Sequence, residues 1–338
     1  MWKNKIVIIP NDNKTKISII IGGKRKMVED SEIKTKVSPF AIREGEIKVF
    51  DGKDGYVSIN QIIQKINVGH ISDVHFKIME LVNEFEFITS RQLFCLLDTD
   101  KYELKSQDKL NNKLEQLVKT KILTRYYFDS EDGKGIYRVY CMEKMGKYLL
   151  NSRGIECKWQ PTDNTKPVAM IKKRLAANQT LIAYKNKVQA FAGYQVKTQI
   201  TAKNMNKAFK TTGPKITLSK QEKSIDLIFE IIRREEEWEK KLEDRMKLYK
   251  DFYSNFSSMD SGFRMLPQLI LQCEDERHMA ECFKIIVMNG LEPEKINLLF
   301  TTDLRQNEGK LDQSLVAFKL DKETNKYKIE NETIKLLG

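Results

Sequence analysis

The chain has 338 residues, of which 41% are hydrophobic and 31% charged, a composition typical of a globular protein and not of a disordered one. Its apolar runs are strand-sized, which excludes a membrane-spanning helix, and its length predicts two or three domains. The formal net charge of +12 favours a polyanionic partner.

Several functional classes lack their sequence signals. The N-terminus has no signal-peptide core with a cleavage site, so we expect a cytoplasmic protein. Five cysteines without CxxC spacing predict reduced, mostly buried thiols, and three histidines without HxxxH or HExxH spacing predict no metal site. No Walker A, GxGxxG or GxSxG motif occurs, so we expect no cofactor and no hydrolase chemistry of these kinds.

The first 66 residues are predicted to be a small β-rich segment. One candidate hairpin pairs Lys5–Ile9 with Lys16–Ile21. A second pairs Ile47–Phe50 with 56–59 across a turn that contains two glycines. Residues 60–66 can form a short helix, and the segment indicates no function.

Residues 71–152 begin with three predicted helices. Ser72 or Asp73 can cap the first helix and Thr89 the second, and the third begins near Ser106. The third helix has apolar residues at i, i+4, i+7 and i+8, which predicts one buried face: Leu110, Leu114, Leu117 and Val118.

Two predicted strands, 122–128 and 136–142, follow these helices and are joined by the polar turn 129–135. Three helices, a strand, a wing and a strand form the order of a winged helix-turn-helix domain. A closing helix is expected at 143–151.

The remaining chain is predicted to be a linker, 153–166, and an α/β domain, 167–338. We expect helices at 168–184, 233–256 and 275–289, with a polar tail after the last strand. The expected strands are 188–200, 215–219, 224–232, Gln268–Cys273, 295–302 and 314–320. The fold class is therefore α+β, with a β-rich segment, a winged helix and an α/β domain.

The positive charge is concentrated between residues 166 and 223. This segment has thirteen Lys or Arg residues against one acid, Glu222, so its formal charge is +12, equal to that of the whole chain. Such a block favours a polyanion, because cations that neutralise phosphates release condensed counterions. The candidate backbone-contacting residues are Lys172, Lys173 and Arg174 on the helix, together with Lys203, Lys207 and Lys210. The last two lie in 204–213, which is expected to be a mobile loop.

The helix that begins at Ser106 is the candidate recognition helix. In a helix-turn-helix domain the N-terminal part of this helix contacts base edges, which Gln, Asn and Lys can read. Its outward residues are predicted to be Gln107, Lys109, Asn112, Lys113 and Gln116. The wing and its strands add Lys134, Arg125 and Arg138. The alternative is a winged helix that is used only for protein contacts. This alternative is favoured by the absence of net charge in residues 71–165.

Residues 71–152 resemble the replication-relaxation type proteins of plasmids and other mobile elements. The matching stretches are 89–94 (TSRQLF), 114–123 (LEQLVKTKIL) and 135–140 (GIYRVY). The resemblance implies a second domain with a restriction-endonuclease-like core. Residues 174–179 and 241–253 resemble the two helices of that core. The resemblance covers 71–152 and 167–302, and leaves 1–66 outside.

A nuclease of that fold needs an acid on its second strand and a (D/E)xK motif on its third, because carboxylates hold Mg²⁺ and the Lys orients water. Asp226 and Glu230 can share one face of a strand, but Ile232 stands where Lys is needed and 215–219 has no acid. The sequence therefore predicts a non-catalytic core without a metal site.

The predicted function is double-stranded-DNA binding, without enzyme activity. The resemblance implies a role in replication initiation or control, or in transfer or transcription of a mobile element. A homodimer and proteins of the replication or transfer machinery are the other expected partners, and no membrane is expected. The alternatives are a metal-dependent nuclease or nickase with a displaced active site, and an adaptor for an acidic protein.

Overall fold

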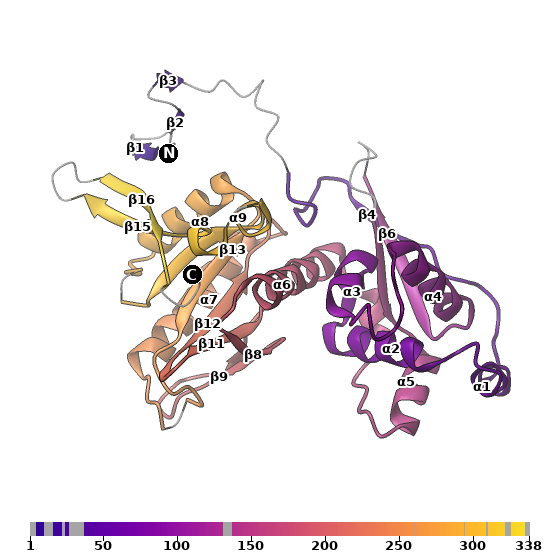
Figure 1. The fold of residues 1–338 in the computed structure, drawn as a ribbon. Coiled ribbons are helices and arrows are strands. Elements are labelled where there is room, and N and C mark those ends of the chain that lie inside the picture. The colour runs from indigo at the N-terminus through magenta and orange to yellow at the C-terminus, as the bar shows by residue number, and fades with distance from the viewer. Residues whose placement is uncertain are drawn as a thin grey trace. The chain divides into compact units, whose positions relative to one another are not determined.

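The computed structural model describes residues 5–9, 16–21, 24–26, 37–130, 137–259, 261–293, 295–308, 310–321 and 326–334. In this part the fold is α+β, with nine α-helices, a four-stranded antiparallel sheet and a larger mixed sheet (Figure 1). The chain divides into two compact units, residues 39–182 and residues 183–338 together with 1–38. None of the helices described combines the length and the apolar composition that a membrane span requires.

The 39–182 unit contains an antiparallel sheet with the order β4-β6-β7-β5. Its strands are β4 (Ile47–Phe50), β5 (Phe87–Thr89), β6 (Leu123–Asp129) and β7 (Arg138–Met142). Its helices are α1 (Ile59–Asn67), α2 (Asp73–Phe85), α3 (Ser90–Leu96), α4 (Gln107–Lys119), α5 (Lys144–Ser152) and the first part of α6 (Val168–Lys187). The three helices and two strands predicted for 71–152 are thus present in the predicted order, with β5 as an additional short strand.

The predicted second hairpin of the N-terminal segment is wrong. β4 pairs with β6, in the register Lys48 with Phe128 and Phe50 with Tyr126, and residues 56–58 are not in a strand. The Phe50 and Tyr126 rings pack edge to face, with centroids 5.8 Å apart. Ser58 caps α1, because its side chain accepts a hydrogen bond from the Gln61 amide and the Gln61 side chain accepts one from the Ser58 amide.

The unit of residues 183–338 contains a mixed sheet with the order β16-β15-β14-β13-β12-β11-β8. The strands are β8 (Phe191–Gln195), β11 (Lys215–Lys220), β12 (Lys223–Ile231), β13 (Gln268–Cys273), β14 (Leu298–Thr302), β15 (Leu315–Asp321) and β16 (Lys326–Glu332). β12, β13 and β14 are parallel, and the other neighbours in this order are antiparallel. A separate two-stranded pair joins β9 (Gln199–Ile200) to β10 (Phe209–Lys210).

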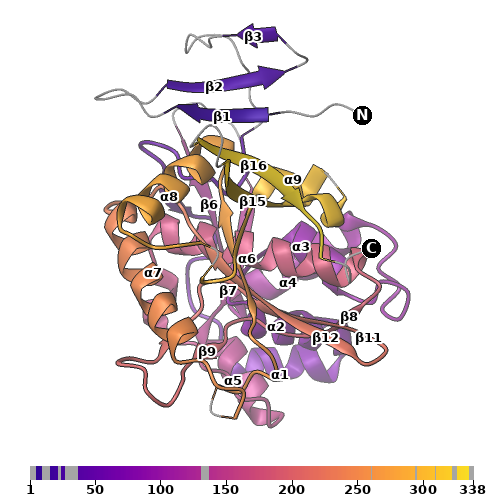
Figure 2. The same ribbon diagram turned by 90° about the vertical axis from the view of Figure 1, so that its left-hand side faces the viewer.

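Two helices cover one face of this sheet, α7 (Trp238–Ser254) and α8 (Glu276–Met288) (Figure 2). Their residues share a core with Ile228 and with β13, β14 and β15. Phe229 points to the opposite face, where its ring packs edge to face with that of Tyr184 in the last turns of α6, at 5.4 Å. Adjacent residues of β12 therefore pack against helices on opposite faces of the sheet, as expected for a strand that is buried on both faces.

Sequence patterns missed two elements near the C-terminus. The expected polar tail contains β16, which pairs with β15, and α9 (Asp303–Glu308) follows β14 directly. The Tyr327 ring of β16 packs against Phe283, at 4.7 Å, and Ile329 also contacts the core. The alternation of Tyr327 and Ile329 with charged residues was a strand signal.

The N-terminal hairpin is confirmed, since β1 (Lys5–Ile9) pairs antiparallel with β2 (Lys16–Ile21). A third strand, β3 (Lys24–Lys26), pairs with β2, and β1 pairs with β16 at Val7 and Lys328.

The boundary between the two units lies within α6 and not in the linker predicted at 153–166. The linker region holds a 3₁₀ helix, Pro161–Thr165, and the buried Trp159, whose indole donates to Asn164 Oδ1 at 3.1 Å. The Asn178 amide of α6 donates to the carbonyls of Phe85 and Phe87, at 3.2 and 2.7 Å. These contacts explain why α6 up to residue 182 belongs with the preceding unit.

Candidate nucleic-acid interface

Helix α4 is fixed by its N-cap and by one apolar face. The Ser106 hydroxyl accepts a hydrogen bond from the Lys109 amide and so caps the helix, which begins next to Ser106 as predicted. The four apolar side chains predicted to face inward are all buried, at 0–1% exposure: Leu110, Leu114, Leu117 and Val118. Burial of this stripe determines which side of α4 faces solvent.

The solvent side of α4 carries Lys109 and Asn112, which are exposed, and Lys113, which is half-buried. The two other predicted readers have partners inside the protein. Gln107 Nε2 donates to the Ser90 carbonyl at 3.2 Å, and to Asn111 Oδ1 at 3.3 Å. Lys109, Asn112 and Lys113 are therefore the α4 side chains best placed to meet a ligand.

Gln116 is tied to the buried His75. Its Oε1 lies 2.7 Å from His75 Nε2, while His75 Nδ1 accepts from the Ser72 amide at 3.0 Å. This pattern assigns the imidazole proton to Nε2. Burial lowers the pKa of His75, although the hydrogen bond with Gln116 opposes this shift. The sequence did not indicate this pair, because His75 and Gln116 lie on different helices.

Arg125 does not fit its predicted role as a DNA contact. It is buried, and its guanidinium bridges Asp51, at 2.9 Å from Oδ2, and Glu115, at 2.5 Å from Oε2. Burial raises the pKa of Glu115, but the hydrogen bond and the charge of Arg125 outweigh this effect. The pKa of Glu115 is therefore below its ordinary value. Arg125 therefore joins α4, β6 and the segment after β4.

Arg138 is exposed at the start of β7, where its Nε donates to Asp51 Oδ2 at 2.8 Å. An exposed ion pair of this kind contributes little stability, so a phosphate can compete for the guanidinium. Lys134, predicted in the wing, lies outside the described residues.

The basic cluster of α6 is a correction to the sequence-based hypothesis. Lys172 is 1% exposed, and its Nζ lies 2.5 Å from Glu46 Oε2 and 2.6 Å from the Ala41 carbonyl oxygen. Arg174 is 5% exposed and 3.5 Å from Glu86, and burial lowers the pKa of its guanidinium. Lys173 is half-buried. A run of three cations suggested a surface, but two of the three side chains are inside the unit.

The lysines predicted between β9 and β11 are exposed: Lys203, Lys207 and Lys210. The segment predicted as a mobile loop has defined anchors. Phe209 is buried against Tyr249 with ring centroids 5.0 Å apart, and the Thr211 hydroxyl accepts from the Thr198 amide at 3.0 Å. The Asn206 amide also donates to Asp251 Oδ2 at 3.0 Å. The hairpin therefore presents three exposed cations from a packed base.

The two strand carboxylates considered for metal binding each accept hydrogen bonds from neighbouring side chains. Glu230 is fully buried and accepts from Tyr249 and Thr212, both at 2.6 Å, with Arg245 at 3.0 Å. Asp226 accepts from Thr217 Oγ1 at 2.5 Å. In the described part of the chain, no three His, Cys, Asp or Glu side chains converge as metal ligands do.

The five cysteines are free thiols, and all but Cys95 are buried, which agrees with the sequence-based expectation. Cys273 and Cys282 bring their sulfur atoms within 3.7 Å in the core between β13 and α8.

Comparison of the chain with protein-family models, with curated proteins and with solved structures found no match.

Proposed function

We propose that this chain is a double-stranded-DNA-binding protein without enzymatic activity. The observation that carries the proposal is α4, a capped helix that follows α3 in helix-turn-helix order and leaves Lys109, Asn112 and Lys113 on its solvent side. In our proposal residues 71–152 act as a winged helix-turn-helix domain, with α4 in the major groove.

The second contact is assigned to the exposed hairpin lysines Lys203, Lys207 and Lys210, which would neutralise backbone phosphates without reading sequence. The interface so defined is smaller than the one predicted from sequence. Arg125, Lys172 and Arg174 are left out because they are buried and paired with carboxylates.

The unit of residues 183–338 is proposed to be a restriction-endonuclease-like core that has no catalytic role. The internal hydrogen bonds of Asp226 and Glu230 support this proposal, because both carboxylates already have partners. The role in replication, transfer or transcription of a mobile element comes from the resemblance of 71–152 and 167–302 to the replication-relaxation type proteins.

The test is a salt series with a labelled duplex, measured by fluorescence anisotropy. If six or more phosphates are contacted, affinity should fall by about three orders of magnitude between about 50 and 200 mM salt. Replacing the three hairpin lysines by Gln should reduce the slope of log K against log salt by up to about 2.7, at 0.9 for each phosphate that is no longer neutralised.

A flat salt response of the wild-type protein would contradict the proposal. The matched control is a triple Gln variant at Lys240, Lys250 and Lys284, exposed lysines of α7 and α8, and it should keep the wild-type slope.

A further inference from the structure

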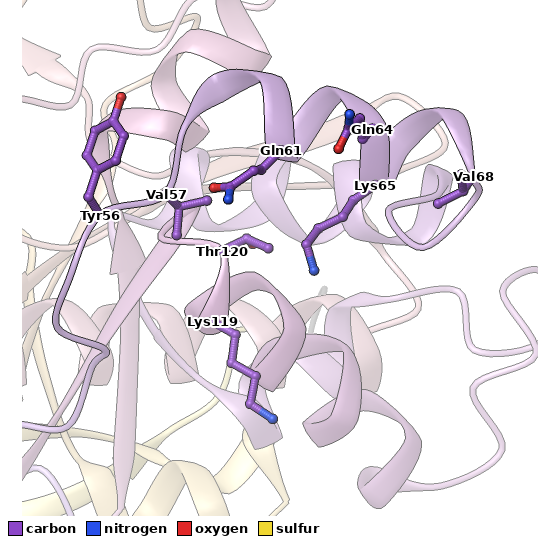
Figure 3. A pocket seen from close by; sticks show the side chains of 8 residues that line it. All are labelled: Tyr56, Val57, Gln61, Gln64, Lys65, Val68, Lys119 and Thr120. Carbon is purple, nitrogen blue, oxygen red and sulfur yellow. The ribbon is translucent and has the colours of Figure 1, made fainter.

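A groove of about 720 Å³ opens between α1 and the C-terminal end of α4 (Figure 3). Tyr56 lies just before α1, Gln61, Gln64 and Lys65 line the groove from α1, and Lys119 lines it from α4. All of these residues belong to the 39–182 unit. The groove is separate from the Lys109, Asn112 and Lys113 set, since it lies at the other end of α4.

The groove is cationic and has no carboxylate in its lining. Figure 3 shows Lys65 extending from α1 towards the end of α4 that carries Lys119. Lys119 is 60% exposed and lies 3.8 Å from Glu115, while Lys65 is exposed and forms no ion pair with a described residue. The lining therefore holds two lysines and no carboxylate, although the Lys119 amino group is shared with Glu115, and this charge favours an anionic ligand.

Tyr56, Gln61 and Gln64 also line the groove. Tyr56 is 83% exposed and makes no ring contact in the described part of the chain, which is unusual for so large an apolar surface. Gln61 and Gln64 are exposed, although Gln61 Oε1 accepts from the Ser58 amide. An aromatic platform with neighbouring amides and cations is suited to an unpaired base and its phosphate.

We propose that this groove binds single-stranded nucleic acid. Lys65 and Lys119 neutralise the backbone, Tyr56 stacks on an unpaired base, and Gln61 Nε2 and the Gln64 amide hydrogen-bond to base edges. The concave shape favours a single strand, because a duplex is convex and its bases are already stacked. This activity is distinct from the duplex binding proposed above and is measured separately.

The experiment measures binding of fluorescein-labelled oligo-dT of about 15 nucleotides to the full chain by anisotropy. Tyr56→Ala should weaken binding roughly tenfold, and Tyr56→Phe, which keeps the ring, should not. Lys65→Gln/Lys119→Gln should lower the slope of log K against log salt by about 1.4, at 0.7 for each phosphate that is no longer neutralised.

The charge-matched control is Lys144→Gln/Lys158→Gln, which removes two exposed lysines outside the groove and should leave the slope unchanged. Thermal melting checks that the exposed substitutions leave the fold intact. The inference fails if wild-type protein does not bind oligo-dT, or if the groove variants bind it as the control does.

Two further results separate the possibilities. Binding of a labelled oligoglutamate in place of oligo-dT would assign the groove to an acidic protein segment and overturn the inference. Oligo-dT binding that depends on the groove, in a protein that does not bind duplex DNA, would support this inference and contradict only the proposed function.

Discussion

At the scale of single residues, burial separates structural cations from surface cations. Lys172 and Glu46 are 1% and 6% exposed and form an ion pair in the 39–182 unit, with the Ala41 carbonyl as a second partner of the ammonium group. Removing one member of such a pair leaves the other charge without compensation in a poorly solvated site.

We therefore expect Lys172→Ala to lower the free energy of unfolding by about 3–5 kcal/mol. The double variant Lys172→Met/Glu46→Gln should recover much of this stability, because neither buried charge remains. The control is Lys185→Ala, at an exposed lysine of the same helix. Denaturant unfolding followed by circular dichroism measures all three. Equal stability of Lys172→Ala and Lys185→Ala would show that the buried pair does not stabilise the fold.

His278 predicts a pH dependence of stability. It is fully buried in α8, its Nδ1 accepts from the Glu274 amide at 3.3 Å, and the Trp238 ring lies edge to face at 4.7 Å. Burial lowers the pKa of His278 to about 3, and the positive charges of Arg234 and Arg233 act in the same direction, opposed by Asp275.

The unfolded chain binds a proton near the ordinary histidine pKa of about 6.5, whereas the folded chain does not bind it until the pH is near 3. Stability is therefore fully present above pH 6.5 and falls as the pH drops from 6.5 towards 3. The slope should approach about 1.4 kcal/mol per pH unit for this proton.

Urea unfolding between pH 7 and pH 4 measures the slope, and His278→Asn, which keeps an acceptor in place of Nδ1, should reduce it. His75, whose pKa burial also lowers, contributes to the slope that remains. The exposed His70→Asn is the control and should keep the wild-type slope. A His278→Asn profile as steep as that of wild type would assign the dependence to other groups. Burial raises the pKa of Asp275, but the hydrogen bond from Arg234 outweighs this effect and the pKa is lowered. Asp275 therefore titrates below the pH range of the measurement.

At the scale of elements, α4 combines a buried stripe with a polar face, and the two respond differently to substitution. Leu110 and Leu114 are fully buried, so their replacement changes stability. Asn112 is exposed and Lys113 is half-buried on the other side, so their replacement should change binding while the fold is retained.

Replacement of both Asn112 and Lys113 by Ala is expected to weaken binding to a preferred duplex by about 1–3 kcal/mol for each base that the variant no longer reads. The effect should be smaller on random duplex, because interactions with base edges carry the specificity. A preferred site is first selected from a random duplex library, and competition binding then measures both affinities. Lys250→Ala in α7 is the control. If the double variant binds both duplexes more weakly by the same factor, α4 contacts only the backbone.

At the scale of the whole molecule, local sequence signals determined most of the elements. Caps and apolar spacing are encoded within a few residues, which is why the cap Thr89, the start of α4 near Ser106 and the buried face of α4 were predicted correctly. The strand Gln268–Cys273 was also predicted with its observed bounds, because an apolar run of that length is a strong local signal.

Tertiary structure decided the partners of those elements. β4 pairs with β6, about 80 residues away, and not with the neighbouring 56–59. Such pairing depends on which long-range contacts compete, and a turn signal cannot decide that. The division of the chain also falls inside α6, since Asn178 and Lys172 bind backbone and carboxylate groups of the preceding unit.

The sequence by itself determined the α+β class, the helix and strand order of 71–152, and the position of the positive charge. Only the tertiary structure decided which cations remain available to a ligand, because a charge run does not show which side chains meet a carboxylate. Lys172, Arg174 and Arg125 are paired inside the protein, whereas Lys203, Lys207 and Lys210 are exposed. The α1–α4 groove likewise arises from Lys65 and Lys119, residues that only folding brings together.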